Sequence, residues 1–191
     1  FFFSSRRRHT RSSLVSWARD VYKRQTVLVP YVEGDEAKLG PIVNADYFGT
    51  VPADRLKVAD GVIRFSGDGQ YRSKIGLTSQ RAKPVLGSYD ATRQLLTIVQ
   101  YTKPEEATDY VNSMWELQAE PFKGDVVNSY NDGPPSPGVK PLGPFYELES
   151  SSPALALKPG ESAAHIHRTI HLQGGEAAVR ALGQALLGAI E

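Results

Sequence analysis

The stretch RLKVADGVIRFSGDGQYRSKIGL, residues 55–77, carries the clearest sign of the fold. Leu56 and Val58 alternate with polar neighbours, and a second alternating run starts at Val62, as expected for half-buried β-strands. An Asp-Gly pair at 60–61 separates the two runs, and this pair is a strong β-hairpin signal. This part of the chain is therefore predicted to form an antiparallel hairpin.

Short strands separated by turns are predicted along most of the chain. Each is rich in β-branched or aromatic residues and ends at turn-forming residues. A Pro/Gly-rich loop is predicted over residues 132–144, where four prolines before Pro144 remove backbone donors that a sheet would need. Besides the hairpin, strands are predicted at 26–32, 86–102 with a turn at Tyr89-Asp90-Ala91-Thr92, 108–118, 125–133, 145–150 and 162–172.

A change of period marks the C-terminal segment. Ala178, Leu182, Leu186 and Ile190 recur every four residues, which predicts an amphipathic helix at about 175–190. Elsewhere strand follows strand without intervening helices. The chain is therefore predicted to be all-β, an antiparallel sandwich closed by a C-terminal helix.

The first 25 residues differ from the rest. They hold seven of the 22 basic residues and one of the 21 acidic residues, and they show neither strand alternation nor a helical stripe. Residues 15–25, VSWARDVYKRQ, resemble the conceptual translation of a transposon-end sequencing adapter. We therefore expect 1–25 to be a non-native segment and the native sequence to begin near Thr26. Without this segment the net charge is −5, which gives no argument for a nucleic-acid partner.

Composition excludes several classes of site. The chain has no cysteine, so neither a disulfide framework nor a thiolate metal site is expected. No apolar run approaches the roughly 20 residues of a spanning helix, so no membrane partner is expected for the part present. No cofactor is predicted. The compartment stays open, with the periplasm and the extracellular space among the options.

The stretch HIHRTIHLQ, residues 165–173, holds three of the four histidines. On a strand, His165, His167 and His171 would share one face. Three interpretations stay open: hydrogen bonds across the sheet, the wall of a ligand pocket, or a metal site completed by a nearby carboxylate. The last would suit a cupin-like metal-dependent enzyme, although the Glu that follows the histidine pair in the cupin motif is missing.

A second resemblance covers more of the chain. LESSSPALALKPGESAAH (148–165) is similar to the C-terminal motif of aldose 1-epimerases, the galactose mutarotases, and the segments at 46–76, 95–105 and 128–134 are similar to earlier parts of that family in the same order. VNSMWE, VVNSYNDGP and HRTIHLQG resemble uncharacterised mutarotase-like domains most closely. The resemblance implies a β-supersandwich, of which residues 26–191 would be the C-terminal part.

This resemblance also implies a chemistry. In mutarotases a carboxylate removes the proton of the anomeric hydroxyl while an acid, usually histidine, protonates the ring oxygen. Glu149 matches the position of the base, whereas no histidine lies between Thr26 and Ala164 to match the acid. The resemblance therefore implies a carbohydrate partner and, if the chain is an enzyme, an aldose 1-epimerase-like isomerase. The expected binding residues are Glu147, Asn128, Tyr130, Asn131, Asp132, His165, His167 and Arg81.

Two alternatives remain beside this hypothesis. One is the cupin-like enzyme, with His165, His167 and His171 as metal ligands. The other is a non-catalytic module that binds a glycan or a protein through the loop NDGPPSPG, residues 131–138. Trp115 fits either a sugar-stacking role or core packing.

Overall fold

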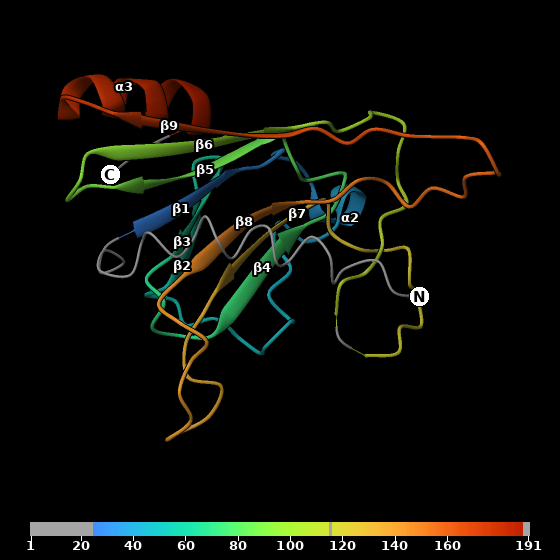
Figure 1. The fold of residues 1–191 in the computed structure, drawn as a ribbon, viewed down its shortest axis with the longest axis horizontal. Coiled ribbons are helices and arrows are strands. Elements are labelled where there is room, and N and C mark those ends of the chain that lie inside the picture. Colours follow the sequence, from blue (N-terminus) through green and yellow to red (C-terminus); the bar gives the residue numbers. More distant parts are fainter. Residues whose placement is uncertain (1–24, 115, 189–191) are drawn as a thin grey trace.

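The computed structural model describes residues 25–114 and 116–188, which form two antiparallel β-sheets and a C-terminal helix (Figure 1). The larger sheet has the strand order β2-β3-β1-β5-β6-β9, and the smaller has the order β4-β7-β8. The predicted all-β class with a terminal helix is confirmed. The elements are β1 (Gln25–Pro30), α2 (Glu36–Leu39), β2 (Leu56–Ala59), β3 (Val62–Ser66), β4 (Ser73–Leu77), β5 (Val85–Asp90), β6 (Leu95–Tyr101), β7 (Val127–Asn131), β8 (Tyr146–Ser150), β9 (His167–Gln173) and α3 (Glu176–Leu187).

The larger hydrophobic core lies between the two sheets. Successive side chains of a strand point to opposite faces, so β4 sends Ile75 and Leu77 into this core and turns Lys74 outward. Phe65 of the six-stranded sheet and Val127 of β7 are buried in the same cluster. Burial of one face of each sheet stabilises the fold and leaves the outward face of the three-stranded sheet able to carry polar groups.

Helix α3 covers the other face of the six-stranded sheet (Figure 1). Its buried side chains, Val179 and Leu187, pack with Leu28 of β1 and Leu96 of β6 in a second hydrophobic cluster. The helix lies at the predicted place, within the residues that the structure describes.

The apolar stripe of α3 differs from the prediction by one residue. Leu182 and Leu186 are 45% and 42% exposed, whereas Val179, Gly183 and Leu187 are buried. The predicted row and the buried row both have a spacing of four residues along the helix. Only contact with the sheet shows which of the two rows is buried. The predicted member Ile190 lies outside the described residues.

Turn residues explain where the strands end. Asp60 and Gly61 both have positive φ angles, 52° and 72°, as a two-residue type I′ hairpin requires, so the predicted β2–β3 hairpin is confirmed. The next turn falls at 91–94, two residues later than predicted. Asp90 ends β5 there, and its carboxylate accepts the backbone N–H groups of Thr92 and Arg93.

Two predicted strands need correction. The described part of 108–118 is irregular, with one bridge between Tyr110 and Lys123. Tyr110 is fully buried, while its neighbour Val111 is 57% exposed. The alternating pattern therefore belongs to a loop that packs against the core through the side chain of Tyr110. The last strand begins at His167, five residues later than predicted.

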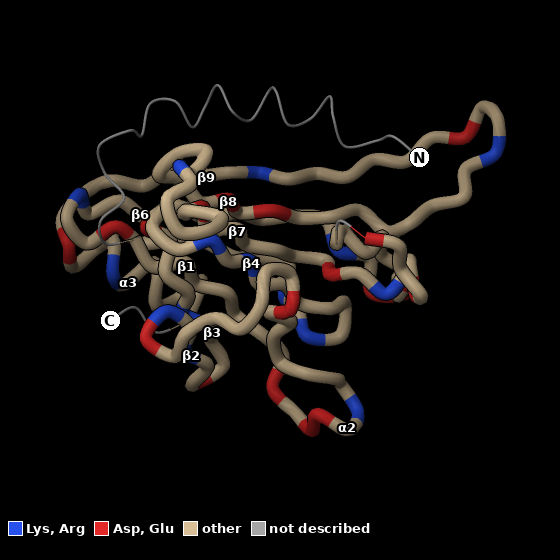
Figure 2. The backbone as a smooth tube through the Cα atoms, turned by 90° about the horizontal axis from the view of Figure 1, so that it is seen from below, with Lys and Arg blue, Asp and Glu red and all other residues tan. Residues whose placement is uncertain are grey.

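Charged positions are interspersed along the described chain. Figure 2 shows Lys and Arg interspersed with Asp and Glu along the described part of the chain. None of the helices in the described ranges has the length and apolar character needed to cross a membrane.

Candidate functional site

The outward face of the three-stranded sheet brings together four of the predicted site residues. The strand register aligns Lys74, Tyr130 and Glu147 in one cross-strand row. The next row on the same face holds Gly76, Asn128 and Glu149. We call this surface the site face and define it by Lys74, Asn128, Tyr130, Glu147 and Glu149.

Glu149 forms an ion pair at the centre of the site face. The Nζ atom of Lys74 lies 3.1 Å from one carboxylate oxygen of Glu149 and 3.3 Å from the other. The side chains are 13% and 26% exposed respectively, so the pair is shielded but still reachable from solvent. Lys74 Nζ also lies 5.3 Å from the ring centroid of Tyr47, a cation–π arrangement that holds the ammonium group in place.

A buried hydrogen-bond network fixes Tyr47. Its hydroxyl donates to Asp125 Oδ2 at 2.6 Å, and Asn44 Nδ2 donates to the same oxygen at 3.1 Å. Asn128 Nδ2 in turn donates to the Tyr47 hydroxyl at 2.9 Å. Burial raises the pKa of Asp125, although the hydrogen bonds from Tyr47 and Asn44 and the charge of Lys74 act in the opposite direction. Burial is also the main cause that raises the pKa of Tyr47.

The raised pKa of Asp125 predicts a pH dependence of stability. Folding favours the protonated carboxyl, so its contribution is fully present below the ordinary pKa of 3.8 and is lost as pH rises through the folded-state pKa. Asp125→Asn should remove this contribution, so the free energy of unfolding should fall less with rising pH in the variant than in the wild type. Urea unfolding at several pH values between about 4 and 7 measures it. The exposed Asp109→Asn variant is the control, and equal pH slopes for Asp125→Asn and wild type would contradict the prediction.

Gly76 makes room for this network. A Cβ atom at this position would lie 2.6 Å from Asp125 Cγ and would also overlap Asn128 Nδ2. Both neighbours are held by hydrogen bonds and cannot move away freely. A side chain at position 76 is therefore incompatible with the observed arrangement of the site face.

Gly76→Ala should destabilise the fold by about 1–3 kcal/mol because the added methyl group overpacks a filled space. Urea unfolding measures the change. Gly174→Ala is the matched control, since the nearest atom to a Cβ atom there would be Val179 Cγ2 at 3.9 Å, an ordinary contact. A loss as small as that of the control would show that the network around Asp125 rearranges easily.

Aromatic rings border the site face on the side of Tyr130. The Tyr130 ring lies 5.7 Å from the ring of Phe48 and 5.9 Å from that of Phe145, measured between centroids. The guanidinium of Arg72 lies 4.3 Å from the ring centroid of Phe48. Together these rings form an apolar border next to the polar centre of the face.

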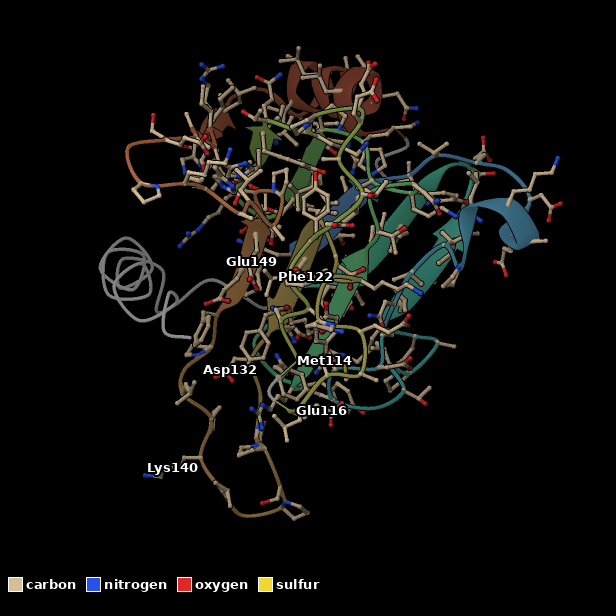
Figure 3. All side chains as sticks on the ribbon, turned by 90° about the vertical axis from the view of Figure 1, so that its right-hand side faces the viewer. Met114, Glu116, Phe122, Asp132, Lys140 and Glu149 are labelled. Carbon is tan, nitrogen blue, oxygen red and sulfur yellow. The ribbon has the colours of Figure 1, made fainter. Side chains whose placement is uncertain are left out.

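Asp132, another predicted site residue, orients Tyr130 from the end of β7. Its Oδ1 accepts the Tyr130 hydroxyl at 2.7 Å, and its Oδ2 accepts the Gly143 N–H at 2.8 Å, which ties together the two ends of the loop at 132–144. Burial, followed by the hydrogen bond to Asp132, raises the pKa of Tyr130 to about 12. Figure 3 shows Glu149 on β8, Asp132 at the loop end of the sheet and Lys140 far out on the loop. Asp132 is 1% exposed, so it acts through Tyr130 and the loop.

Asn131 and Arg81 lie apart from the site face, in contrast to the sequence prediction. Asn131 points to the inner side of β7, where its amide accepts the Gly69 N–H and donates to Asp68 and to the Tyr71 carbonyl. Arg81 is fully buried and donates four hydrogen bonds to backbone carbonyls. Both side chains hold loops in place.

The histidines meet Ser150 and do not join Glu149. His165 Nε2 and His167 Nδ1 lie 2.9 and 2.8 Å from the Ser150 hydroxyl. Ser150 follows Glu149 and therefore points to the opposite face of β8. Strand β9 pairs with β6 in the other sheet, so it does not run beside Glu147 and Glu149.

The third histidine lies away from this pair. The Nδ1 atom of His171 is 3.0 Å from the Thr97 hydroxyl on β6. Among residues 25–114 and 116–188, no three His, Asp or Glu side chains are grouped so that they could hold a metal ion. The described structure therefore offers no geometric support for the cupin-like alternative.

Sequence reasoning missed Lys74, Tyr47 and Asp125. Lys74 lies on the polar side of an alternating strand, a signal that was present but common to many solvent-exposed lysines. Tyr47 comes from a loop some 80 positions away from its partners in the sequence, as the separation of 78 from Asp125 shows. Ser113 lowers the pKa of Tyr47 and so acts against the effect of burial. Ser113 belongs to the segment that holds Met114 and Phe122, both of which are labelled in Figure 3. Trp115 lies outside the described residues.

Comparison with known proteins gives one match. A search of curated proteins and a search of solved structures both found no match to this chain. The family model described as "Family of unknown function (DUF6786)" matches residues 8–190, which is nearly the whole chain. The chain therefore belongs to DUF6786, a family of unknown function.

Proposed function

We propose that this chain binds a carbohydrate on the site face and that Glu149 acts as a base at the anomeric centre of the sugar. The observation that carries the proposal is the Glu149–Lys74 pair, which is partly shielded yet reachable and lies beside amide and aromatic side chains. The resemblance of residues 148–165 to the C-terminal motif of aldose 1-epimerases supports the same assignment for Glu149.

The site face has the chemical character that a sugar requires. Every sugar hydroxyl can donate one hydrogen bond and accept others, so a binding surface needs both kinds of partner. Glu147 and Glu149 supply carboxylate acceptors and Lys74 supplies an ammonium donor, while the buried Asn128 holds the Tyr47 hydroxyl. The ring of Tyr130 offers an apolar surface of the kind that packs against the C–H groups of a sugar ring. These groups lie on adjacent strands, so one small ligand can reach several of them.

The close approach of a carboxylate and an ammonium group suits exchange between anomers. Glu149 would take the proton of the anomeric hydroxyl while Lys74 gives a proton to the ring oxygen, and the C–O bond of the ring then breaks to form an open-chain aldehyde. Reclosure on either face of the carbonyl returns the proton on Glu149 to the anomeric oxygen and the proton on the ring oxygen to Lys74. The hydroxyl oxygen and the ring oxygen are both bonded to the anomeric carbon. A carboxylate and an ammonium group only 3.1 Å apart can therefore reach both oxygens. Lys74 thus takes the acid role for which the resemblance provides no histidine.

The test uses the full chain and a panel of common aldoses. Saturation-transfer NMR measures binding, and NMR exchange spectroscopy measures the rate of interconversion between α and β anomers. We expect one or more aldoses to bind and to exchange faster than in buffer. Binding without faster exchange would remove the base role of Glu149 and leave a binding module. A complete absence of binding and of faster exchange across the panel would overturn the proposal.

A further inference from the structure

A serine and two histidines meet between the two sheets, away from the site face. Ser150 is the last residue of β8 and His167 is the first residue of β9. Each of these strands lies at the edge of its sheet, so the cluster joins one edge of the smaller sheet to one edge of the larger. Ser150, His165 and His167 are all half-buried, which leaves them within reach of a small molecule from solvent. Ser150 points to the opposite face of β8 from Glu149, so the cluster is separate from the proposed carbohydrate site.

The contacts at Ser150 are those of an activated hydroxyl. Its Oγ atom lies 2.9 Å from His165 Nε2 and 2.8 Å from His167 Nδ1. A hydroxyl carries one proton and two acceptor lone pairs, so it can donate to only one of the two rings. The other ring therefore donates its N–H to Oγ. One imidazole is placed to take the proton of the hydroxyl, and the second is placed to stabilise the charge that then develops on the oxygen.

A backbone N–H group lies next to the same hydroxyl. In an antiparallel ladder the N–H groups of successive residues point alternately toward the partner strand and away from it. The N–H of Ser151 donates to the Val126 carbonyl on the β7 side, so the N–H of Ser150 points away from β7. Among the described strands β7 is the sole neighbour of β8, so this N–H faces the outer edge of the sheet. There it can donate to the carbonyl oxygen of a bound ester.

From this arrangement we propose that Ser150 is the nucleophile of a second site, which hydrolyses small carboxylic esters. Ser150 Oγ bonds to the carbonyl carbon while its proton passes to the accepting imidazole, and the N–H of Ser150 holds the carbonyl oxygen. The C–O bond to the alcohol then breaks as the imidazole gives the proton to the alcohol oxygen. A water molecule releases the acid from Ser150 by the same steps and restores the hydroxyl.

The experiment treats the full chain with an alkyl fluorophosphonate, a probe that reacts with activated serines, and measures the hydrolysis of p-nitrophenyl acetate in parallel. We expect a mass adduct on Ser150 and hydrolysis faster than in buffer, and both should be lost in Ser150→Ala. Ser151→Ala is the matched control, because Ser151 is the half-buried neighbour, and it should react like the wild type. No adduct on Ser150, or hydrolysis in the wild type no faster than in Ser150→Ala, would overturn the proposal.

Histidine variants test whether the imidazoles activate the hydroxyl. The double variant His165→Gln/His167→Gln should label about 10²-fold more slowly, within the usual contribution of a general base. His171→Gln is the control, because its Nδ1 lies 3.0 Å from the hydroxyl of Thr97 rather than that of Ser150, and it should label at the wild-type rate. Equal rates in the double variant and the wild type would refute the proposal.

A cysteine at position 150 keeps the test valid if Ser150→Ala folds poorly. The chain has no cysteine, so iodoacetamide finds a single thiol in Ser150→Cys. An adjacent imidazole favours the thiolate, the reactive form, so Ser150→Cys should be alkylated about tenfold faster than the control Ser151→Cys. Similar rates in the two variants would show that position 150 is not activated and would overturn the proposal.

Discussion

Glu149→Gln should lower the rate of anomer exchange by about 10²- to 10⁴-fold, the usual contribution of a general base. Glutamine has nearly the same shape as glutamate but cannot take up the proton of the anomeric hydroxyl. The exchange rate is measured by NMR exchange spectroscopy with the aldose that binds the wild type best. Saturation transfer to that sugar should persist, because the side-chain amide still offers an acceptor oxygen.

Two further variants separate proton transfer from a general change in charge. Glu106→Gln alters an exposed carboxylate away from the site face and should leave the exchange rate unchanged. Lys74→Met keeps the aliphatic stem but loses the proposed acid, so exchange should fall while the thermal unfolding midpoint changes little. A Glu149→Gln protein that exchanges anomers at the wild-type rate would exclude Glu149 as the base.

A spacing of two residues is enough to place a pair of side chains on one face of a strand. Glu147 and Glu149, and likewise Asn128 and Tyr130, are two residues apart, and this spacing places each pair on one side of its strand wherever the strand lies in the fold. The structure adds that the two strands are neighbours, which brings the pairs into the same rows. The partners of these residues could not be predicted, because strand pairing depends on contacts between distant segments.

The histidines also show that local spacing does not determine strand pairing. Their spacing correctly suggested that His167 and His171 lie on one face of a strand, but it could not show which strand would pair with β9. Pairing with β6 placed them on the six-stranded sheet, and the late start of β9 left His165 outside it. A pattern of period two defines the faces of a strand, whereas its neighbour and register are set by the rest of the core.

Arg81 illustrates a different limit. In sequence it was a basic residue near a loop, which is also how a ligand-binding arginine looks. In the structure its Nε and Nη2 donate to the Gly40 carbonyl at 3.0 and 2.6 Å, and its Nη1 donates to the carbonyls of Val32 and Gly34 at 2.8 and 3.2 Å. The guanidinium therefore closes the loop around α2 against the β4–β5 connection. Only the positions of these carbonyls, which are fixed by the fold, reveal this role.

Arg81→Ala should consequently destabilise the fold by about 3–5 kcal/mol. The substitution leaves three backbone carbonyls without their donor and opens a cavity where a fully buried side chain was. Arg81→Lys should recover only part of the loss, because a single ammonium group cannot match the planar set of donors that Arg81 uses. Urea unfolding of both variants measures the change in free energy.

The exposed Arg93→Ala is the control for the loss of one positive charge, and its effect should stay within about 0.5 kcal/mol. Arg81→Ala with stability close to that of this control would mean that water or a rearranged loop satisfies the carbonyls. If that variant also lost sugar binding while it stayed folded, Arg81 would return to the binding role suggested by the sequence. A large loss of stability in Arg81→Ala, together with an intermediate loss in Arg81→Lys, would instead establish the guanidinium as the group that holds the 32–40 loop in place.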